Sequence, residues 1–136
     1  MTDISVSATT RRRAPSRLWL AGEHGADAPL HVPYDFTTFS HENFSAGYIP
    51  NGTILGKITA SKLFGPYDPA ATDGRETAAA IAFNDDLIPD DTSRVVTGAA
   101  VRHCGVVVSG LPFKSGPGSL DAAARAALAG VIQWFE

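Results

Sequence analysis

The chain has 136 residues, of which 44% are hydrophobic and 18% charged, with a formal net charge of −3 at pH 7. This length suits one domain with a real core, the composition excludes a disordered chain, and the mild negative charge argues against a general DNA or RNA binder. The sequence has no run of about 18 apolar residues and no charged-then-apolar start, so it predicts a soluble protein made in a cytoplasm.

The first 16 residues are small and polar and offer nothing to bury, which predicts a mobile arm. Three consecutive arginines, residues 11–13, suit an acidic partner surface, but residues 1–50 carry four Arg and no Lys against five acids. A short apolar, strand-like piece follows: Arg17, Leu18, Trp19 and Leu20. It either folds back on its own domain or adds to a sheet edge of another subunit.

Aromatic side chains are concentrated between residues 34 and 48. They are Tyr34, Phe36, Phe39, Phe44 and Tyr48. We interpret them as core residues in preference to a partner-facing patch.

Three histidines also lie in the first half of the chain: His24, His31 and His41. Their separations of seven and ten residues do not match a helical metal-binding pair, so no metal site is predicted.

Residues 52–76 form the centre of the chain. Alternation over residues 54–59 predicts a strand, and the pairs Gly-Pro, Asp-Pro and Asp-Gly that follow predict a stiff, ordered loop. The loop residues are Gly65, Pro66, Tyr67, Asp68, Pro69, Asp73 and Gly74. Tyr67, Asp68, Asp73, Arg75 and Glu76 would suit a small ligand at a subunit interface, but we favour turn capping and an Arg75–carboxylate pair.

The stretch after the loop is ambiguous, since the alanines of residues 75–83 favour a helix while their alternation favours a strand. Four aspartates within residues 85–91 lack calcium-loop spacing and predict a solvated acidic loop. Residues 94–102 predict a strand and residues 106–108 its buried partner strand.

The single cysteine, Cys104, precludes an internal disulfide and is interpreted as a small buried hydrophobe. Its neighbour His103 points to the opposite face of a strand, which argues against a Cys–His nucleophile.

The C-terminal part predicts one short helix ending near Ala129, with Ser119 as N-cap and Asp121 in the first turn. Gly130 would end it in a left-handed turn. Residues 131–135 alternate like a final strand, whose Trp134 would pack in the core or at a subunit boundary. Signatures of catalysis are missing, so no catalytic residue, cofactor or metal is predicted.

In order and spacing, several of these pieces resemble the lambda-type head decoration proteins of tailed bacteriophages. The likeness is carried by residues 53–59, the loop at 65–74, the strand at 78–83, the segments 101–103 and 106–108, the helix start at 120–123 and residues 131–132. It covers residues 45–136, and it favours the strand at 78–83.

The resemblance implies a mainly β (α+β) fold with one short C-terminal helix, a small β-barrel or β-sandwich-like domain, and an extended N-terminal arm. Residues 1–44 would be the partly mobile, capsid-docking arm, with Arg17, Leu18, Trp19 and Leu20 as capsid-binding residues, and residues 45–136 the trimerisation domain.

The implied function is that of a cement protein, not an enzyme. It would form homotrimers at threefold sites on the outer surface of the mature virion and bind the major capsid protein. Neither nucleic acid nor membrane would be a partner.

Two alternatives stay open from the residues alone. The chain would be a small trimeric β-barrel enzyme with its site around residues 67–76, or a monomeric β-rich interaction module of a host.

Overall fold

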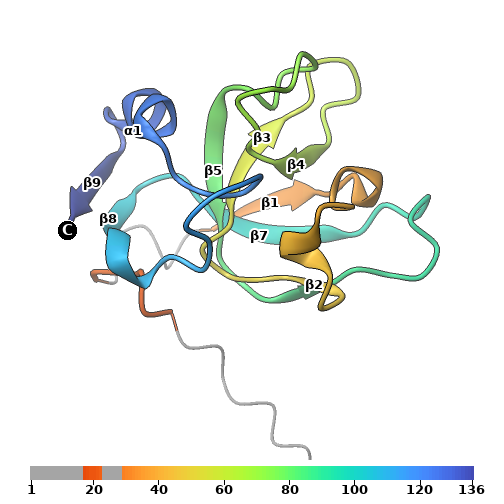
Figure 1. Cartoon of the computed structure of the whole chain (residues 1–136), viewed down its shortest axis with the longest axis horizontal. Coiled ribbons are helices and arrows are strands. Elements are labelled where there is room, and N and C mark those ends of the chain that lie inside the picture. The colour runs from red at the N-terminus through yellow and green to blue at the C-terminus, as the bar shows by residue number, and fades with distance from the viewer. Residues whose placement is uncertain (1–16, 23–28) are drawn as a thin grey trace, which may run out of the picture.

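The computed structural model describes residues 17–22 and 29–136. The predicted mobile arm, its arginine triplet and His24 lie outside the described residues. The described chain is mainly β, with one short α-helix near its C-terminal end (Figure 1). The strands are β1 (Leu30–Pro33), β2 (Tyr48–Ile49), β3 (Ile54–Lys57), β4 (Phe64–Pro66), β5 (Ala78–Ala82), β6 (Asp86–Leu87), β7 (Thr97–Val101), β8 (Cys104–Val107) and β9 (Ile132–Phe135). The helix is α1 (Ala122–Leu128), and single 3-10 turns are η1 (Phe36–Thr38), η2 (Glu42–Phe44) and η3 (Val108–Gly110).

An antiparallel five-stranded sheet in the order β1-β7-β5-β3-β4 forms the centre of the fold. Its middle strands are buried on both faces. In β3, Ile54 belongs to one apolar cluster and Leu55 to the other, and in β7 Val101 and Ala100 divide in the same way. This period of two follows from strand geometry, in which successive side chains point to opposite faces.

Two layers cover the two faces of this sheet. On one side lie α1, β8 and β9, whose buried residues Ala124, Leu128 and Ile132 join Ile54 and Val101 in the first apolar cluster. On the other side, residues 34–44 and 113 supply a chain of aromatic rings. The aromatics Tyr34, Phe36, Phe39 and Phe44 are therefore core residues as predicted, and the arrangement is β-sandwich-like. Tyr48 differs, since its side chain is exposed.

The two edges of the five-stranded sheet approach each other without pairing along their length. Where β1 ends, Tyr34 forms one isolated bridge with Phe64 of β4, and the Asp35 amide donates to the Phe64 carbonyl at 2.9 Å. The described strands therefore do not close into a barrel.

Residues 30–44 lie in the part of the chain assigned to the arm, and the structure packs them into the β body. β1 pairs with β7 over four residue pairs, and Phe39 and Phe44 stack edge to face at 4.9 Å between ring centroids. The burial of these aromatics explains the placement, since a chain segment with four large apolar side chains gains most by covering a sheet face.

Several details differ from the sequence predictions because distant partners decide them. The stretch from residue 65 to residue 74 was predicted to be a loop throughout, but its first residues belong to β4, which pairs with β3. β8 does not pair with β7; it lies parallel to β9 in a separate two-stranded sheet. The acidic stretch contains β6, which pairs with β2, and is therefore not simply a solvated loop.

The ends of α1 also differ from the prediction. Asp121, not Ser119, is the N-cap, and its carboxylate accepts from the Ala124 amide at 2.8 Å. The Ser119 hydroxyl instead donates to the Gly116 carbonyl. Gly130 does not adopt a positive φ, and the helix ends at Leu128, followed by Ala129 as C-cap in the right-handed region.

Beyond α1, β9 is the final strand that alternation predicted. Trp134 is half-buried against the first apolar cluster, and its indole nitrogen is buried with no hydrogen-bond partner among the described residues. Within residues 17–22 and 29–136, no helix has the length and apolar character needed to cross a membrane.

Candidate functional site

Tyr67 anchors the loop that the sequence analysis singled out. Its ring is buried, its amide donates to the Ile54 carbonyl at 2.8 Å, and its hydroxyl donates to both carboxylate oxygens of Asp121, at 2.8 and 3.0 Å. Burial, together with this carboxylate, raises the pKa of Tyr67 to about 12. The phenol therefore stays protonated at neutral pH and is engaged in holding the loop to the start of α1.

Asp121 makes two contacts at once, because its carboxylate caps α1 and accepts a hydrogen bond from the Tyr67 hydroxyl. We expect Asp121→Ala to lower the free energy of unfolding by about 2 kcal/mol, about half from the lost cap and half from the buried hydroxyl left without an acceptor. Ser119→Ala is the matched control and should change stability by less than about 0.5 kcal/mol. Equal losses in urea denaturation of the two variants would contradict this assignment of the cap.

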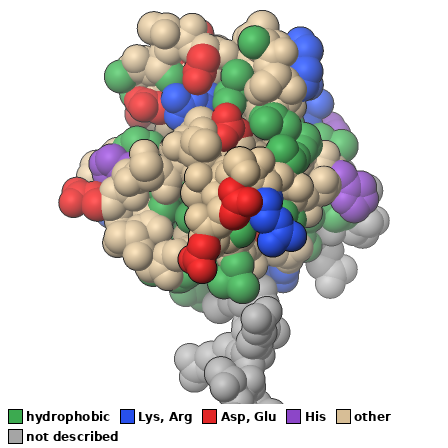
Figure 2. Space-filling view, turned by 90° about the vertical axis from the view of Figure 1, so that its right-hand side faces the viewer, with side chains coloured by type: hydrophobic (Ala, Val, Ile, Leu, Met, Phe, Trp, Pro, Cys, Tyr) green, Lys and Arg blue, Asp and Glu red, His purple; other side chains and the backbone are tan. Residues whose placement is uncertain are grey.

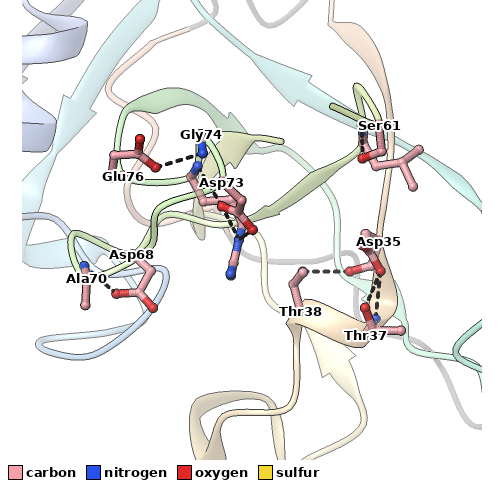
Figure 3. A network of polar contacts seen from close by, with 11 residues as sticks. Asp35, Thr37, Thr38, Ser61, Asp68, Ala70, Asp73, Gly74 and Glu76 are labelled. Carbon is pink, nitrogen blue, oxygen red and sulfur yellow. Dashed lines mark hydrogen bonds and ion pairs between the residues drawn. The ribbon is translucent and has the colours of Figure 1, made fainter. Parts of the chain in front are cut away.

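The charged side chains of the loop close its turns (Figure 3). Asp73 accepts from the Arg75 amide at 3.2 Å and from the Arg75 guanidinium at 3.0 Å. Glu76 accepts from the Gly74 amide at 2.8 Å, and Asp68 from the Ala70 amide at 3.0 Å. These are contacts within the loop, so the geometry supports the capping interpretation over a ligand site.

A polar hollow of about 350 Å³ lies beside this loop, lined in part by His41, Asp68 and Arg75. Of the described side chains that line it, no two share a hydrogen bond, and each of the three has a partner elsewhere: His41 accepts from the Asn43 amide as the cap of η2. The described side chains that line the hollow therefore do not form a hydrogen-bonded nucleophile and base pair.

The Asp73–Arg75 pair predicts a pH dependence. Partial burial alone would raise the pKa of Asp73, but hydrogen bonds and charge from Arg75 outweigh it and hold this pKa below its usual value. A carboxyl with a lowered pKa in the folded state stabilises the fold above its unfolded-state pKa, and that contribution is lost as the pH falls through the folded-state pKa.

We therefore expect Asp73→Asn to be less stable than the parent at pH 7 and to converge with it as the pH is lowered below about 4. Urea midpoints at pH 7, 4 and 3 measure the difference. A gap between the two proteins that is the same at all three values would show that charge is not the cause.

The segment predicted to bind the capsid folds back onto its own domain. Trp19 is 1% exposed within the first apolar cluster, and its indole N–H donates to the Asn51 side chain at 2.7 Å. Asn51 in turn donates to Asp85 from its amide and its side chain, at 2.7 and 2.8 Å. Of the two readings left open by the sequence, the structure shows the fold-back for this segment.

The neighbours of Trp19 differ in what they present to solvent. Arg17 donates to the Phe83 carbonyl and to Asn84, both at 2.7 Å, and its guanidinium lies 3.9 Å from the centre of the Phe83 ring. Leu20 forms an isolated antiparallel bridge with Val106. Leu18, by contrast, is 73% exposed, so it is the member of the segment whose apolar side chain is available to a partner.

The remaining polar candidates are structural or isolated. Burial raises the pKa of the Cys104 thiol to about 11, as expected of a small buried hydrophobe. In the part of the chain that the structure describes, no three His, Cys, Asp or Glu side chains are grouped so as to hold a metal ion.

The structure also shows surface features that the sequence analysis missed. Tyr48 and Leu87 are directly opposite in the β2–β6 pair and both are exposed, and Val95 is 57% exposed. Apolar residues inside an acidic, turn-rich stretch were a signal for such a surface. Figure 2, which views the molecule from the right-hand side of Figure 1, shows acidic, basic and apolar side chains exposed together on that face.

Comparison with known protein families gives a match over most of the chain. The family model described as bacteriophage lambda head decoration protein D matches residues 36–132. No curated protein and no solved structure matches the chain. The matched region runs from η1 to the first residue of β9 and so contains the loop at residues 65–76, α1 and four strands of the central sheet.

Proposed function

The chain belongs to the bacteriophage lambda head decoration protein D family and is a structural protein of the phage capsid, and from this premise we propose how it acts. It forms homotrimers at threefold and quasi-threefold sites on the outer surface of the mature head. There it binds the major capsid protein and stabilises the shell against the pressure of the packaged DNA. The protein is made in the host cytoplasm and acts without a cofactor, nucleic acid or membrane.

The observation that carries this proposal is the family match over residues 36–132. The interior of the matched region supports a passive role, because the charged groups of its central loop close turns and the Tyr67 hydroxyl of that loop is bonded to Asp121 at the start of α1. A body stabilised in this way is suited to presenting fixed surfaces to neighbours. The capsid gains because each bridge between subunits adds contact area that must be broken before they separate.

Symmetry supports placement at threefold sites. A cyclic trimer presents three equal surfaces, so at a threefold axis each copy makes the same contact with its underlying capsid subunit. A single copy on a threefold axis could not make the same contact with all three capsid subunits.

We propose that capsid docking belongs to the N-terminal part of the chain and trimerisation to the β body. Because residues 30–44 pack inside the body, their contribution to either role is restricted to their exposed side chains. In the segment 17–20, Trp19 would fix the backbone while Leu18, with Arg17 beside it, meets the capsid protein.

The test is co-sedimentation of purified protein with expanded, undecorated capsids of its phage. We expect saturable binding near one trimer per threefold site, and no binding to unexpanded shells. Absence of saturable binding to expanded shells would refute the function.

Leu18→Ser tests the docking segment. Because Leu18 is 73% exposed, the variant should keep its stability within about 0.5 kcal/mol yet bind capsids at least about tenfold more weakly, as for loss of an apolar anchor. Val131→Ser, a change at another exposed aliphatic residue, is the matched control. Equal capsid binding by both variants would place the docking surface elsewhere.

A further inference from the structure

A groove lies where the five-stranded sheet fails to close. One wall is β1, the other contains Lys57 at the end of β3 and Phe64 of β4, and the floor is Ala79 and Ala80 of β5. Its volume is about 410 Å³. Because β1 and β4 are the edge strands of the described sheet, and the floor side chains are small, the groove has room for a segment of another chain.

The charges on this groove are all of one sign. Lys57, Lys62 and Arg102 line it, and His31 lies on the β1 wall. No carboxylate is among the described residues that line it, and none of the three cations has an ion pair or side-chain hydrogen bond within the described chain. Glu76, three residues before Ala79 of the floor, borders the adjacent hollow and accepts from the Gly74 amide.

Three cations without an ion pair in the described part of the chain are notable, because the net charge of the chain is −3. A solvated lysine without an ion pair costs a protein little stability, so the presence of these cations alone would not indicate a binding partner. Here they surround an apolar floor and the Phe64 ring, with the Lys57 ammonium 5.8 Å from the ring centre. A partner that suits both properties is an acidic segment with apolar side chains.

The same chain carries such a segment at a different place. The segment of residues 87–96, which is the last residue of β6 and the β6–β7 connection, projects from the body at the right of Figure 1. Asp90 and Asp91 on it are exposed, and so are the apolar side chains of Leu87 (67%) and Val95 (57%). Asp85 and Asp86, by contrast, accept hydrogen bonds from Asn51 and Tyr34. Asp91 accepts from Ser93 within the segment, but its side chain is exposed, so Asp90 and Asp91 are the acids of this segment that present charge to a partner.

We propose that the acidic segment 87–96 of one copy docks in the basic groove of the next copy, and that this contact joins the subunits of the ring. Because the two surfaces are different patches of one molecule, the contact is head-to-tail, and a head-to-tail contact that closes gives a cyclic oligomer. The inference rests on the proposed trimer and adds which surfaces form it.

Charge reversal tests the pairing. The double variant Lys57→Glu/Arg102→Glu and the double variant Asp90→Lys/Asp91→Lys should each weaken trimer formation at least about tenfold, since rim ion pairs become like-charge contacts. An equimolar mixture of the two should not recover a homogeneous ring, but the quadruple variant carrying both changes should. Lys114→Glu, at an exposed lysine outside the groove, is the control.

Disulfide trapping gives a second readout. Lys62→Cys and Asp90→Cys, mixed under mild oxidation, should give a mixed disulfide dimer in free protein at high concentration or on decorated capsids. Asp90→Cys mixed with Lys114→Cys should not. The native Cys104 does not interfere, because it is buried.

The outcomes separate this inference from the function. Wild-type protein that decorates capsids as trimers, but neither responds to charge reversal nor forms the Lys62→Cys/Asp90→Cys disulfide in either setting, overturns the inference alone. Wild-type protein that ignores expanded capsids overturns the function, whatever the disulfide result. If each double variant loses trimer formation and the quadruple variant recovers it, the result supports the proposed contact.

Discussion

Replacing Trp19 with alanine should lower the free energy of unfolding by about 3–5 kcal/mol, the usual cost of removing a large buried aromatic side chain. The indole is 1% exposed and belongs to the apolar cluster between the five-stranded sheet and α1. Its loss would leave a cavity, and the side-chain oxygen of Asn51 would lose the hydrogen bond that the indole N–H donates. Urea denaturation followed by circular dichroism measures the change, with the midpoint shifted and the slope retained.

Two neighbouring substitutions make this result specific. Trp19→Phe keeps much of the buried area but removes the N–H that meets Asn51, so it should cost about 1–3 kcal/mol. Leu18→Ala, one residue away and 73% exposed, should cost less than about 0.5 kcal/mol. A Trp19→Ala variant as stable as Leu18→Ala would show that the segment does not depend on the body for its position.

The position of this segment could not be obtained from the sequence. Its pattern is compatible with a strand on either its own domain or a neighbour, and the contacts that decide lie far along the chain. Trp19 bonds Asn51, 32 residues away, and Arg17 bonds Phe83 and Asn84, 66 and 67 residues away. Local periodicity carries no information about such pairings.

Where a local pattern suffices, prediction agrees with the structure. The alternation around Ile54 gave a strand, the aromatics of residues 34–44 gave core residues, and the alanine-rich stretch after residue 119 gave the helix. The N-cap was misassigned because Ser119 and Asp121 are both good caps. The Tyr67 hydroxyl, 54 residues from Asp121, also bonds its carboxylate.

The loop at residues 65–76 could be predicted from the sequence, whereas the basic groove could not. Turn chemistry is local, so the capping role of Asp73 and the turn at Asp68-Pro69 were readable from the Asp-Gly and Asp-Pro pairs. The basic groove was not, since His31, Lys57, Lys62 and Arg102 are scattered in sequence and only the curl of the sheet brings them together. The periodicity of a sequence does not reveal a surface that binds another chain.

Replacing Gly74 with alanine should lower the free energy of unfolding by about 3–4 kcal/mol. Gly74 has a φ of +117°, a conformation that side chains with a Cβ adopt only under strain. A Cβ there would also overlap the Lys57 carbonyl oxygen and lie 2.6 Å from the Thr59 hydroxyl oxygen. Strain and crowding each cost about 1–3 kcal/mol, and backbone atoms cannot move aside as a flexible side chain can.

The crowded side of Gly74 is the point where the loop returns to the sheet. The Thr59 amide donates to the Asp73 carbonyl at 2.9 Å, so a displaced residue 74 would pull the loop away from the end of β3. Gly130→Ala is the matched control, because a Cβ there meets nothing within 4 Å and its φ is not positive. The control should match the parent or gain up to about 1 kcal/mol from a stiffer unfolded chain. If both alanine variants unfold at the same urea concentration, the loop at residues 65–76 does not hold the rigid conformation described.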